Sequence, residues 1–101
     1  MEFSIVEGKE TQITVKGKLD FAQAPRLMDA LAELKGKDIT TITFDCADLT
    51  YISSSGIRVI IFAKQKITPN MTIVMSDVNE DVMEVLDICG IADFIEFTTT
   101  G

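Results

Sequence analysis

Residues 45–63 read DCADLTYISSSGIRVIIFA, and within them a strand pattern gives way to a helix pattern. Leading into this stretch, Ile42, Phe44 and Cys46 alternate with polar residues, the two-residue period of a strand with one buried face. After the serines, apolar side chains follow the helical period and fall on one broad face. They are Val59, Ile60, Ala63 and Ile67, with Ile57 and Ile61 at the edge. We predict a strand over about 39–46, a short loop, and a helix over about 55–67 that ends before Pro69.

The rest of the chain continues this alternation of strands and helices. Short strands are predicted at 3–5 and 13–15, joined by a hairpin turn at 7–10, with Gly17 ending the pairing, and further strands at 71–76 and 94–98. Two more amphipathic helices are predicted from stripes of apolar residues, and Gly36 and Gly90 are expected to end them. The stripes are Leu27, Ala30, Leu31 and Leu34, and then Val82, Val85, Leu86 and Cys89. Asp77 and Glu80 have the spacing of a capping box.

The strands that alternate have clearly polar faces, so we expect helices to cover only one side of the sheet. A hairpin followed by strand–helix–strand crossovers gives a mixed, mainly parallel sheet. We therefore predict an α/β fold of four to five strands with three main helices on one face. The 101 residues suffice for one core, so we expect a single domain over residues 1–101.

Composition argues against several classes of function. The chain has 16 acidic and 9 basic residues and a formal charge of −7, which disfavours nucleic acid and direct membrane binding. It has no basic leader and no long apolar run, so we expect a soluble, cytoplasmic protein. Cys46 and Cys89 lack the spacing of a metal or redox motif and are interpreted as small buried hydrophobes.

Histidine is absent, which removes the Ser-His-Asp and Cys-His routes and the commonest metal ligand. A hydrolase that uses Ser54 or Ser55 is disfavoured further, because Lys64 and Lys66 lie two to three helical turns from the serines. We expect no catalytic residue, no metal and no cofactor.

The segment DLTYISSSGI at residues 48–57 resembles the signature of the STAS domain, the family of anti-sigma factor antagonists. Two further segments at the expected spacing extend the resemblance over nearly the whole chain. GKLD at 17–20 is similar to the family's Gly-x-Leu-Asp, and GIADF at 90–94 is similar to its closing turn. The resemblance implies the same one-sided α/β fold.

The resemblance also implies a phosphorylation site at the serine cluster. Gly56 matches the motif glycine, Ser55 the second serine and Ser54 the serine that a partner kinase phosphorylates. Ser53 stands where the family most often has aspartate, and Ser53 and Ser55 remain alternative acceptors on chemistry alone. A purely structural role, in which a serine caps the helix, is compatible with the same residues.

Other residues near the serines are candidates for partner binding. Asp20 follows the second strand and can cap the next helix, and the resemblance also implies that it belongs to the kinase-facing surface. Arg58 can pair with an acidic group or the phosphate, or can simply be solvated. Phe62 either packs on a neighbouring helix or is a hydrophobic anchor beside the loop. With Ile57 and Gly56, these residues and the serines make up the predicted partner surface.

Two functions follow from the resemblance. The first is an anti-sigma factor antagonist that binds an anti-sigma factor with serine/threonine-kinase activity and so frees a sigma factor. Phosphorylation of the antagonist releases the partner, and a phosphatase restores binding. In this role we expect a monomer or weak dimer. The second is a STAS subunit that binds the cytoplasmic ATPase of a membrane lipid transporter. Serine at position 53 is compatible with this second role, which needs no phosphorylation. Ser54 and Ser55 followed by Gly56 favour the first role, in which phosphorylation controls binding.

Overall fold

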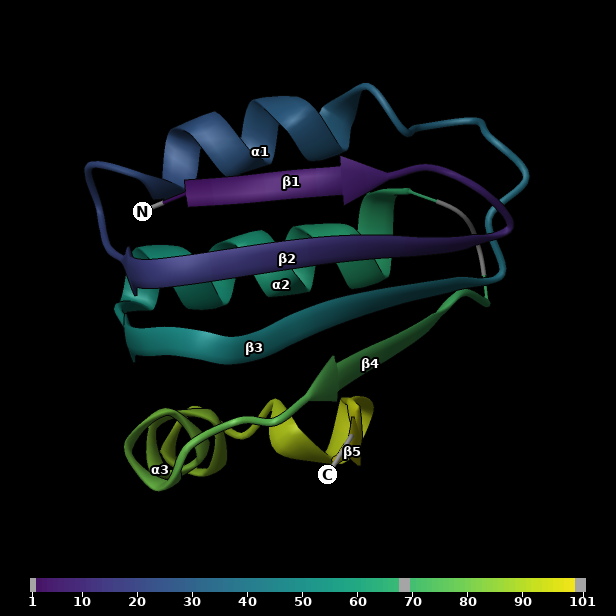
Figure 1. The fold of residues 1–101 in the computed structure, drawn as a ribbon. Helices are drawn as coiled ribbons and strands as arrows, with labels where there is room; N and C mark the ends of the chain where they lie inside the picture. Colours follow the sequence, from purple (N-terminus) through teal and green to yellow (C-terminus); the bar gives the residue numbers. More distant parts are fainter. Residues whose placement is uncertain (1, 68–69, 100–101) are drawn as a thin grey trace.

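The computed structural model describes residues 2–67 and 70–99, which form five strands, three α-helices and a 3-10 helix (Figure 1). In order these are β1 (Glu2–Val6), β2 (Glu10–Leu19), α1 (Ala24–Ala32), β3 (Thr41–Ile52), α2 (Ser54–Lys66), β4 (Thr72–Ser76), α3 (Glu80–Ile88), the 3-10 helix η1 (Ala92–Phe94) and β5 (Glu96–Thr98). The sheet order is β1-β2-β3-β4-β5; β1 and β2 are antiparallel and the other neighbours parallel. The predicted mixed, mainly parallel sheet is confirmed.

Burial alternates along the strands, as expected of a sheet with one covered face. On β2, Thr11, Ile13 and Val15 are buried while the residues between them are exposed or half-buried, and β3 begins with the same pattern. Figure 1 shows α2 behind the strands with α1 beside it. The largest buried side chains are Phe44, Ile13, Leu19, Leu27, Leu31, Ile42, Leu49, Met71, Ile73, Met75, Leu86 and Val15.

Strand β3 is longer than predicted, because it runs to Ile52 rather than ending near Cys46. Its register against β2 shifts twice, between Thr14 and Lys16 and between Gly17 and Lys18. Each shift breaks the two-residue alternation, so residues 47–48 and 50–51 are exposed in pairs. Residues 47–52 therefore resemble a loop in the sequence although they form a strand.

The same irregularity explains why Gly17 does not end the second strand. Gly17 has φ of +80° and pairs with Leu49 at the second register shift. Glycine tolerates this left-handed conformation, so the strand continues through it to Leu19. The carboxyl ends of β2 and β3 thus lie next to each other, with Leu19 opposite Ile52.

Two helix boundaries also differ from prediction. Helix α1 ends at Ala32, because the chain then tightens into i to i+3 hydrogen bonds before Gly36. Helix α3 is capped by Asn79 and not by Asp77: the Val82 N–H donates to Asn79 Oδ1 at 2.8 Å, and Asp77 has φ of +57°.

The last segments correct two further expectations. Helix α3 ends at Ile88, so Cys89 falls at its C-cap and is exposed, whereas Cys46 is buried as expected. The final strand is shorter than 94–98, because residues 92–94 form η1. Helix α2 occupies 54–66, close to the predicted range, and Pro69 lies outside the described residues.

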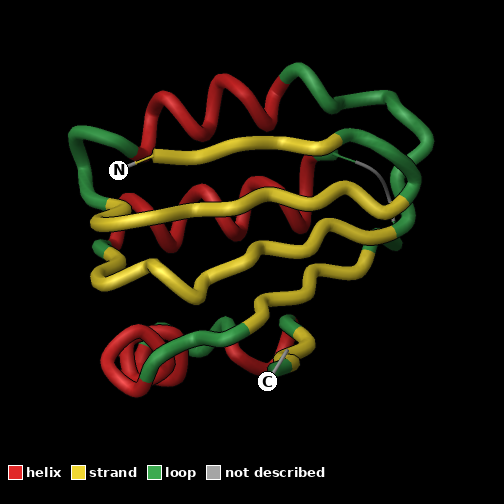
Figure 2. Tube along the Cα trace, viewed as in Figure 1, coloured by secondary structure: helices red, strands yellow, loops and turns green. Residues whose placement is uncertain are grey.

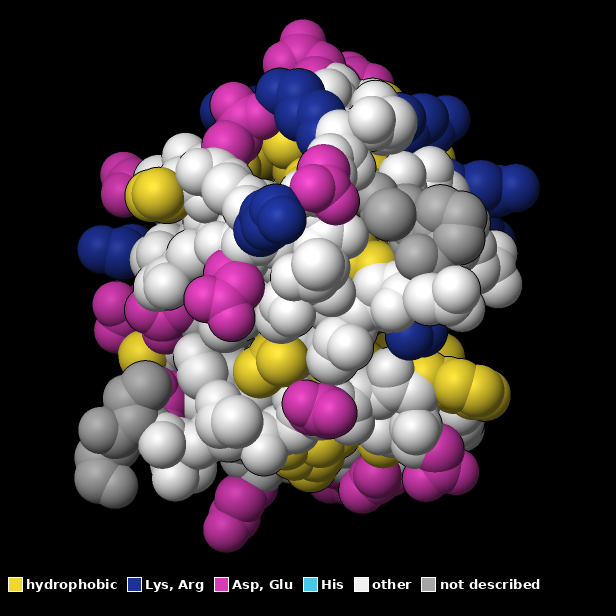
Figure 3. All heavy atoms as spheres, turned by 90° about the vertical axis from the view of Figure 1, so that its right-hand side faces the viewer, with side chains coloured by type: hydrophobic (Ala, Val, Ile, Leu, Met, Phe, Trp, Pro, Cys, Tyr) yellow, Lys and Arg dark blue, Asp and Glu magenta, His cyan; other side chains and the backbone are white. Residues whose placement is uncertain are grey.

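The end of the sheet opposite the serines carries charges of both signs, which Figure 3 shows interspersed. Lys9 lies 3.6 Å from Asp38, and Lys37 pairs with Glu7, so the β1–β2 turn is linked to the segment after α1. These pairs are largely exposed and contribute little stability. None of the helices in residues 2–67 and 70–99 is long and apolar enough to cross a membrane.

Candidate functional site

The serine cluster lies where β3 turns into α2, a junction that Figure 2 shows as a short segment between strand and helix. Ser53 is the N-cap of α2, and the Gly56 N–H donates to its Oγ at 3.3 Å. Ser53 also joins the end of β2, because its N–H and its hydroxyl both donate to the Leu19 carbonyl, at 3.0 and 3.3 Å. The Ser53 hydroxyl is thus fully engaged in the backbone structure.

The other two serines begin the first turn of α2. Ser54 is exposed and Ser55 is half-buried, and within the described residues neither hydroxyl has a hydrogen-bond partner. Ser54 is therefore the serine of the cluster that presents a free hydroxyl to solvent at the start of a helix.

Gly56 and Ile57 are buried, which corrects their place in the predicted partner surface. A Cβ on Gly56 would lie 2.7 Å from Ile52 Cγ1 and 2.8 Å from the Leu19 carbonyl oxygen. Ile57 is only 5% exposed and belongs to the core. Both residues seat the start of α2 on the sheet, so they position the serines and offer a partner little surface.

Asp20 lies at the same edge, directly after the Leu19–Ile52 pair. Its Oδ1 accepts hydrogen bonds from the N–H groups of Ala22 and Gln23, both at 3.1 Å. It therefore closes the turn before α1, while the N-cap position itself is held by Gln23. Since Asp20 is only half-buried, this capping role leaves part of the carboxylate facing solvent beside the serines.

Arg58 and Phe62 differ in what they offer to a partner. Arg58 is exposed, and within the described residues it has no ion pair or side-chain hydrogen bond. Phe62 is half-buried against the core, and the Lys35 ammonium lies 5.1 Å from its ring centroid. Of the two roles left open for Phe62, its contacts are those of packing beside α1, two turns along α2 from the serines.

Comparison with known families identifies the fold. A model of the STAS domain matches residues 4–100. The chain belongs to the STAS domain family. Comparison with curated protein sequences gave no match.

Solved structures share the fold of this STAS domain at low sequence identity. A Thermotoga maritima protein assigned as an anti-sigma factor antagonist has a TM-score of 0.83 at 18% identity, covering 98% of this chain and 86% of that one. An anti-sigma factor antagonist from Mycobacterium paratuberculosis has a TM-score of 0.83 at 12% identity, and the match covers 96% of this chain and 84% of that one. The Bacillus cell fate determinant SpoIIAA in its phosphorylated form has a TM-score of 0.75 at 16% identity, covering 98% and 93%. The unphosphorylated form of SpoIIAA, an anti-sigma factor antagonist, gives a TM-score of 0.75 at 14% identity, covering 99% and 89%.

This STAS domain also exposes two aromatic side chains near the serines that were not predicted as site residues. Phe21 follows Asp20 directly and is 78% exposed, and Tyr51 precedes Ile52 and is 48% exposed. Phe21 belongs to none of the apolar stripes in the sequence, and this could have indicated that its side chain is exposed.

The electrostatics of the site favour an added negative charge. The first turn of α2 contains no acidic residue, while Lys64 and Lys66 lie in its last turn. The partial positive charge at the helix N-terminus is therefore not offset by a side chain of the helix itself. Within the described residues no group of three or more Cys, Asp or Glu side chains is placed to hold a metal ion.

Proposed function

We propose that this STAS domain is a phosphorylation-switched binding module that acts as an anti-sigma factor antagonist in the cytoplasm. In its unphosphorylated form it binds an anti-sigma factor with serine/threonine-kinase activity and so frees a sigma factor. Phosphorylation of Ser54 ends the complex, and a phosphatase restores it. The observation that carries the proposal is the exposed Ser54 hydroxyl at the first turn of α2.

Ser54 is the preferred acceptor among the three serines for a structural reason. The Ser53 hydroxyl accepts from the Gly56 N–H and donates to the Leu19 carbonyl, so its modification would disrupt the cap. Ser55 is half-buried, which restricts access of a kinase. Only Ser54 combines an exposed side chain with a hydroxyl that the described structure does not use.

A phosphate on Ser54 should leave the fold intact. It would lie at a helix N-terminus, where negative charge is favoured by about 0.3–1 kcal/mol. The likeness of both forms of Bacillus SpoIIAA to this chain, with a TM-score of 0.75 each, supports a fold that tolerates phosphorylation. The effect falls on the partner instead, because about 1.5–2 units of negative charge would have to be desolvated in the interface.

The partner surface that we propose is built around Ser54 from Phe21, Asp20, Ser55 and Arg58. Phe21 takes the anchor role first considered for Phe62, since an exposed aromatic ring gains most from being covered in a complex. Asp20 and Arg58 supply charges of opposite sign at its rim. In this role the chain is a monomer or weak dimer and catalyses no reaction itself.

The test uses a kinase-type anti-sigma factor from the same genome, with ATP and with the non-hydrolysable analogue AMP-PNP. Mass spectrometry should find one phosphate on Ser54 in wild type and none in Ser54→Ala. Binding in AMP-PNP should be retained by Ser54→Ala and weakened at least tenfold by Ser54→Asp. Ser4→Ala changes an exposed serine on β1 and is the matched control for both measurements.

Equal partner affinity for the alanine and aspartate variants would contradict the switch. Phosphate found on Ser53 or Ser55 would retain the switch but move the acceptor. Phe21→Ala should weaken binding at least tenfold, whereas Phe94→Ala, an equally large change at a site 66% exposed elsewhere, should not. Recovery of a transporter ATPase and no kinase in pull-downs would favour the structural-subunit role.

A further inference from the structure

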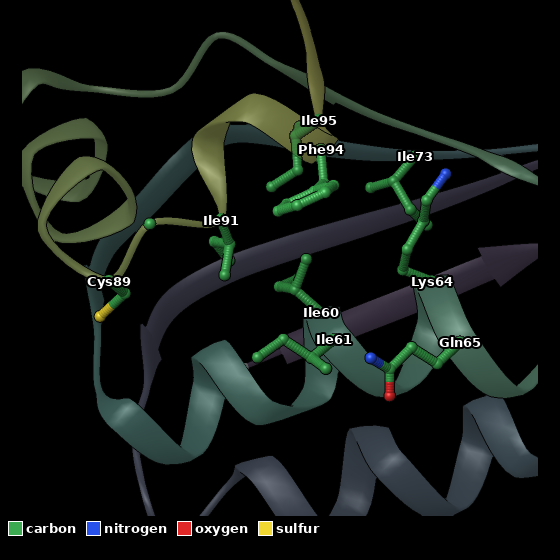
Figure 4. Close-up of a pocket in the computed structure, with 10 residues that line it drawn as sticks. Ile60, Ile61, Lys64, Gln65, Ile73, Cys89, Ile91, Phe94 and Ile95 are labelled. Atoms are coloured by element: carbon green, nitrogen blue, oxygen red, sulfur yellow. The ribbon is translucent and has the colours of Figure 1, made fainter.

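An apolar groove separates α2 from the segment that contains α3 and η1 (Figure 4). Its volume is about 360 Å³. Its apolar lining consists of Ile60, Ile61, Ile73, Ile91, Phe94 and Ile95. Phe94 is 66% exposed at the rim, so the groove is accessible from solvent. A volume at the lower end of the range for small-molecule sites, with a mostly apolar lining, fits one small ligand.

A single cation stands at one end of this groove. Lys64 lines it together with Gln65, and Figure 4 shows both at the end away from Cys89. Lys64 is half-buried, and its Nζ donates to the Met71 carbonyl at 2.8 Å. An ammonium has three donors, so two remain after this bond.

Lys64 has no carboxylate partner among the described residues, although the chain has 16 acidic residues and only 9 basic ones. A partly desolvated cation without a counter-ion favours an anion supplied from outside. The groove therefore combines a long apolar wall with one positive charge at its end that has no carboxylate partner among the described residues.

We propose that this groove binds one medium-length acyl chain that ends in a carboxylate. The chain lies against the isoleucines of α2 and of the η1 segment, and the carboxylate accepts hydrogen bonds from Lys64. A single cation at one end matches a single anionic head group, whereas a helix or a second protein copy would require polar partners along a longer rim. This inference does not depend on the proposed switch at Ser54.

The test is a titration of the full ¹⁵N-labelled chain with sodium decanoate below its micelle concentration, followed by amide chemical shifts. We expect saturable one-to-one binding, with the largest shifts at residues 60–65 and 89–95. Decanol, which has the same chain length and no charge, should bind at least tenfold more weakly. Octanoate should bind about fifteenfold more weakly than decanoate, since each methylene removed costs about fourfold.

Variants separate the charge from the apolar wall. Lys64→Met should reduce decanoate affinity at least tenfold and leave decanol affinity unchanged, and Lys64→Arg, which retains the charge and a donor for Met71, should stay within threefold of wild type. Lys66→Met, on the same helix but exposed and outside the groove, is the matched control and should have no effect. Ile61→Gln should weaken both ligands at least threefold, because it places a polar group in the wall.

Several outcomes would overturn the proposal. They are equal binding of decanol and decanoate, equal losses from Lys64→Met and Lys66→Met, or shifts centred outside the groove. Groove amides that move with protein concentration in the absence of decanoate would assign the groove to a second copy of the chain. Retained binding in Ile61→Gln would place the acyl chain elsewhere.

Discussion

Replacing Gly56 with alanine tests the close approach of α2 to the sheet. The added Cβ would lie 2.7 Å from Ile52 Cγ1, 2.9 Å from Leu19 Cγ and 2.8 Å from the Leu19 carbonyl oxygen. All three distances are shorter than normal van der Waals contact, and the Leu19 carbonyl is held by hydrogen bonds from the Ser53 N–H and hydroxyl. Overpacking of this kind costs about 1–3 kcal/mol.

The better helix propensity of alanine offsets at most about 1 kcal/mol of that cost. We therefore expect a net loss of about 1–2 kcal/mol in the free energy of unfolding, which for a domain of this size lowers the melting temperature by roughly 4–16 °C. The loss in the free energy of unfolding is measured by urea denaturation monitored by circular dichroism, provided that the m-value is the same for the variant and the wild type.

The matched control is Gly8→Ala. The nearest atoms to a Cβ on Gly8 lie at 3.8 and 4.0 Å, which is ordinary contact. The free energy of unfolding of Gly8→Ala should stay within about 0.5 kcal/mol of wild type. A Gly56→Ala protein as stable as wild type would show that α2 can move away from the sheet, and would remove the reason for treating the position of Ser54 as fixed.

Three further predictions concern caps and a buried thiol. Ser53→Ala should cost about 1–3 kcal/mol in urea denaturation, because it loses both the cap on the Gly56 N–H and the hydrogen bond from its hydroxyl to the Leu19 carbonyl. Ser53→Asp retains the cap and adds charge at the helix N-terminus but cannot donate to the Leu19 carbonyl, so its stability should lie between those of Ser53→Ala and wild type; equal stability of the two variants would argue against the cap. Asn79→Ala should also cost about 1–3 kcal/mol, since it too loses a helix cap and a second hydrogen bond, the one from Nδ2 to the Leu49 carbonyl at 2.9 Å; a variant as stable as wild type would contradict this. Burial, and secondarily the nearby carboxylates, raises the pKa of the Cys46 thiol from 9.0 to about 12. The unfolded chain therefore loses this proton at lower pH than the folded one, and the free energy of unfolding should fall between pH 9 and 12 by at most about 1.4 kcal/mol per pH unit, a component that Cys46→Ala should lack. Because Cys46 is buried and Cys89 exposed, the native protein should react with a thiol reagent at Cys89 only.

The fold could be predicted from the sequence because its elements have one buried face. Period-two alternation around Phe44 and helical stripes such as the one through Leu27 and Leu31 encode that face directly. The second half of β3 could not be predicted, because two register shifts against β2 place exposed residues in pairs and erase the alternation. A bulge depends on the neighbouring strand, and that neighbour is unknown while only the sequence is available.

The sequence predicted where the serine cluster lies in the fold, between a strand and a helix, but not how its three hydroxyls differ. Three adjacent serines are equivalent in the sequence, and only the geometry of the cap separates the engaged hydroxyl of Ser53 from the exposed one of Ser54. The helical pattern placed Phe62 on a polar side, yet Lys35 beyond α1 lies over its ring. Phe21 was missed because no periodic pattern of apolar residues includes it.

Serine in place of the family's usual aspartate at position 53 has a specific electrostatic consequence. An aspartate cap would put a carboxylate one residue from Ser54 and partly neutralise the positive end of α2. Ser53 provides the same acceptor for the Gly56 N–H without charge, and the first turn of α2 has no other acid. At the same edge of the sheet, the Asp20 carboxylate directly follows the Leu19–Ile52 pair, and it already accepts two backbone hydrogen bonds. The helix N-terminus would therefore be left to stabilise a phosphate on Ser54, so under the proposed switch the penalty of phosphorylation would arise in the complex with a partner and not in the folding of this chain.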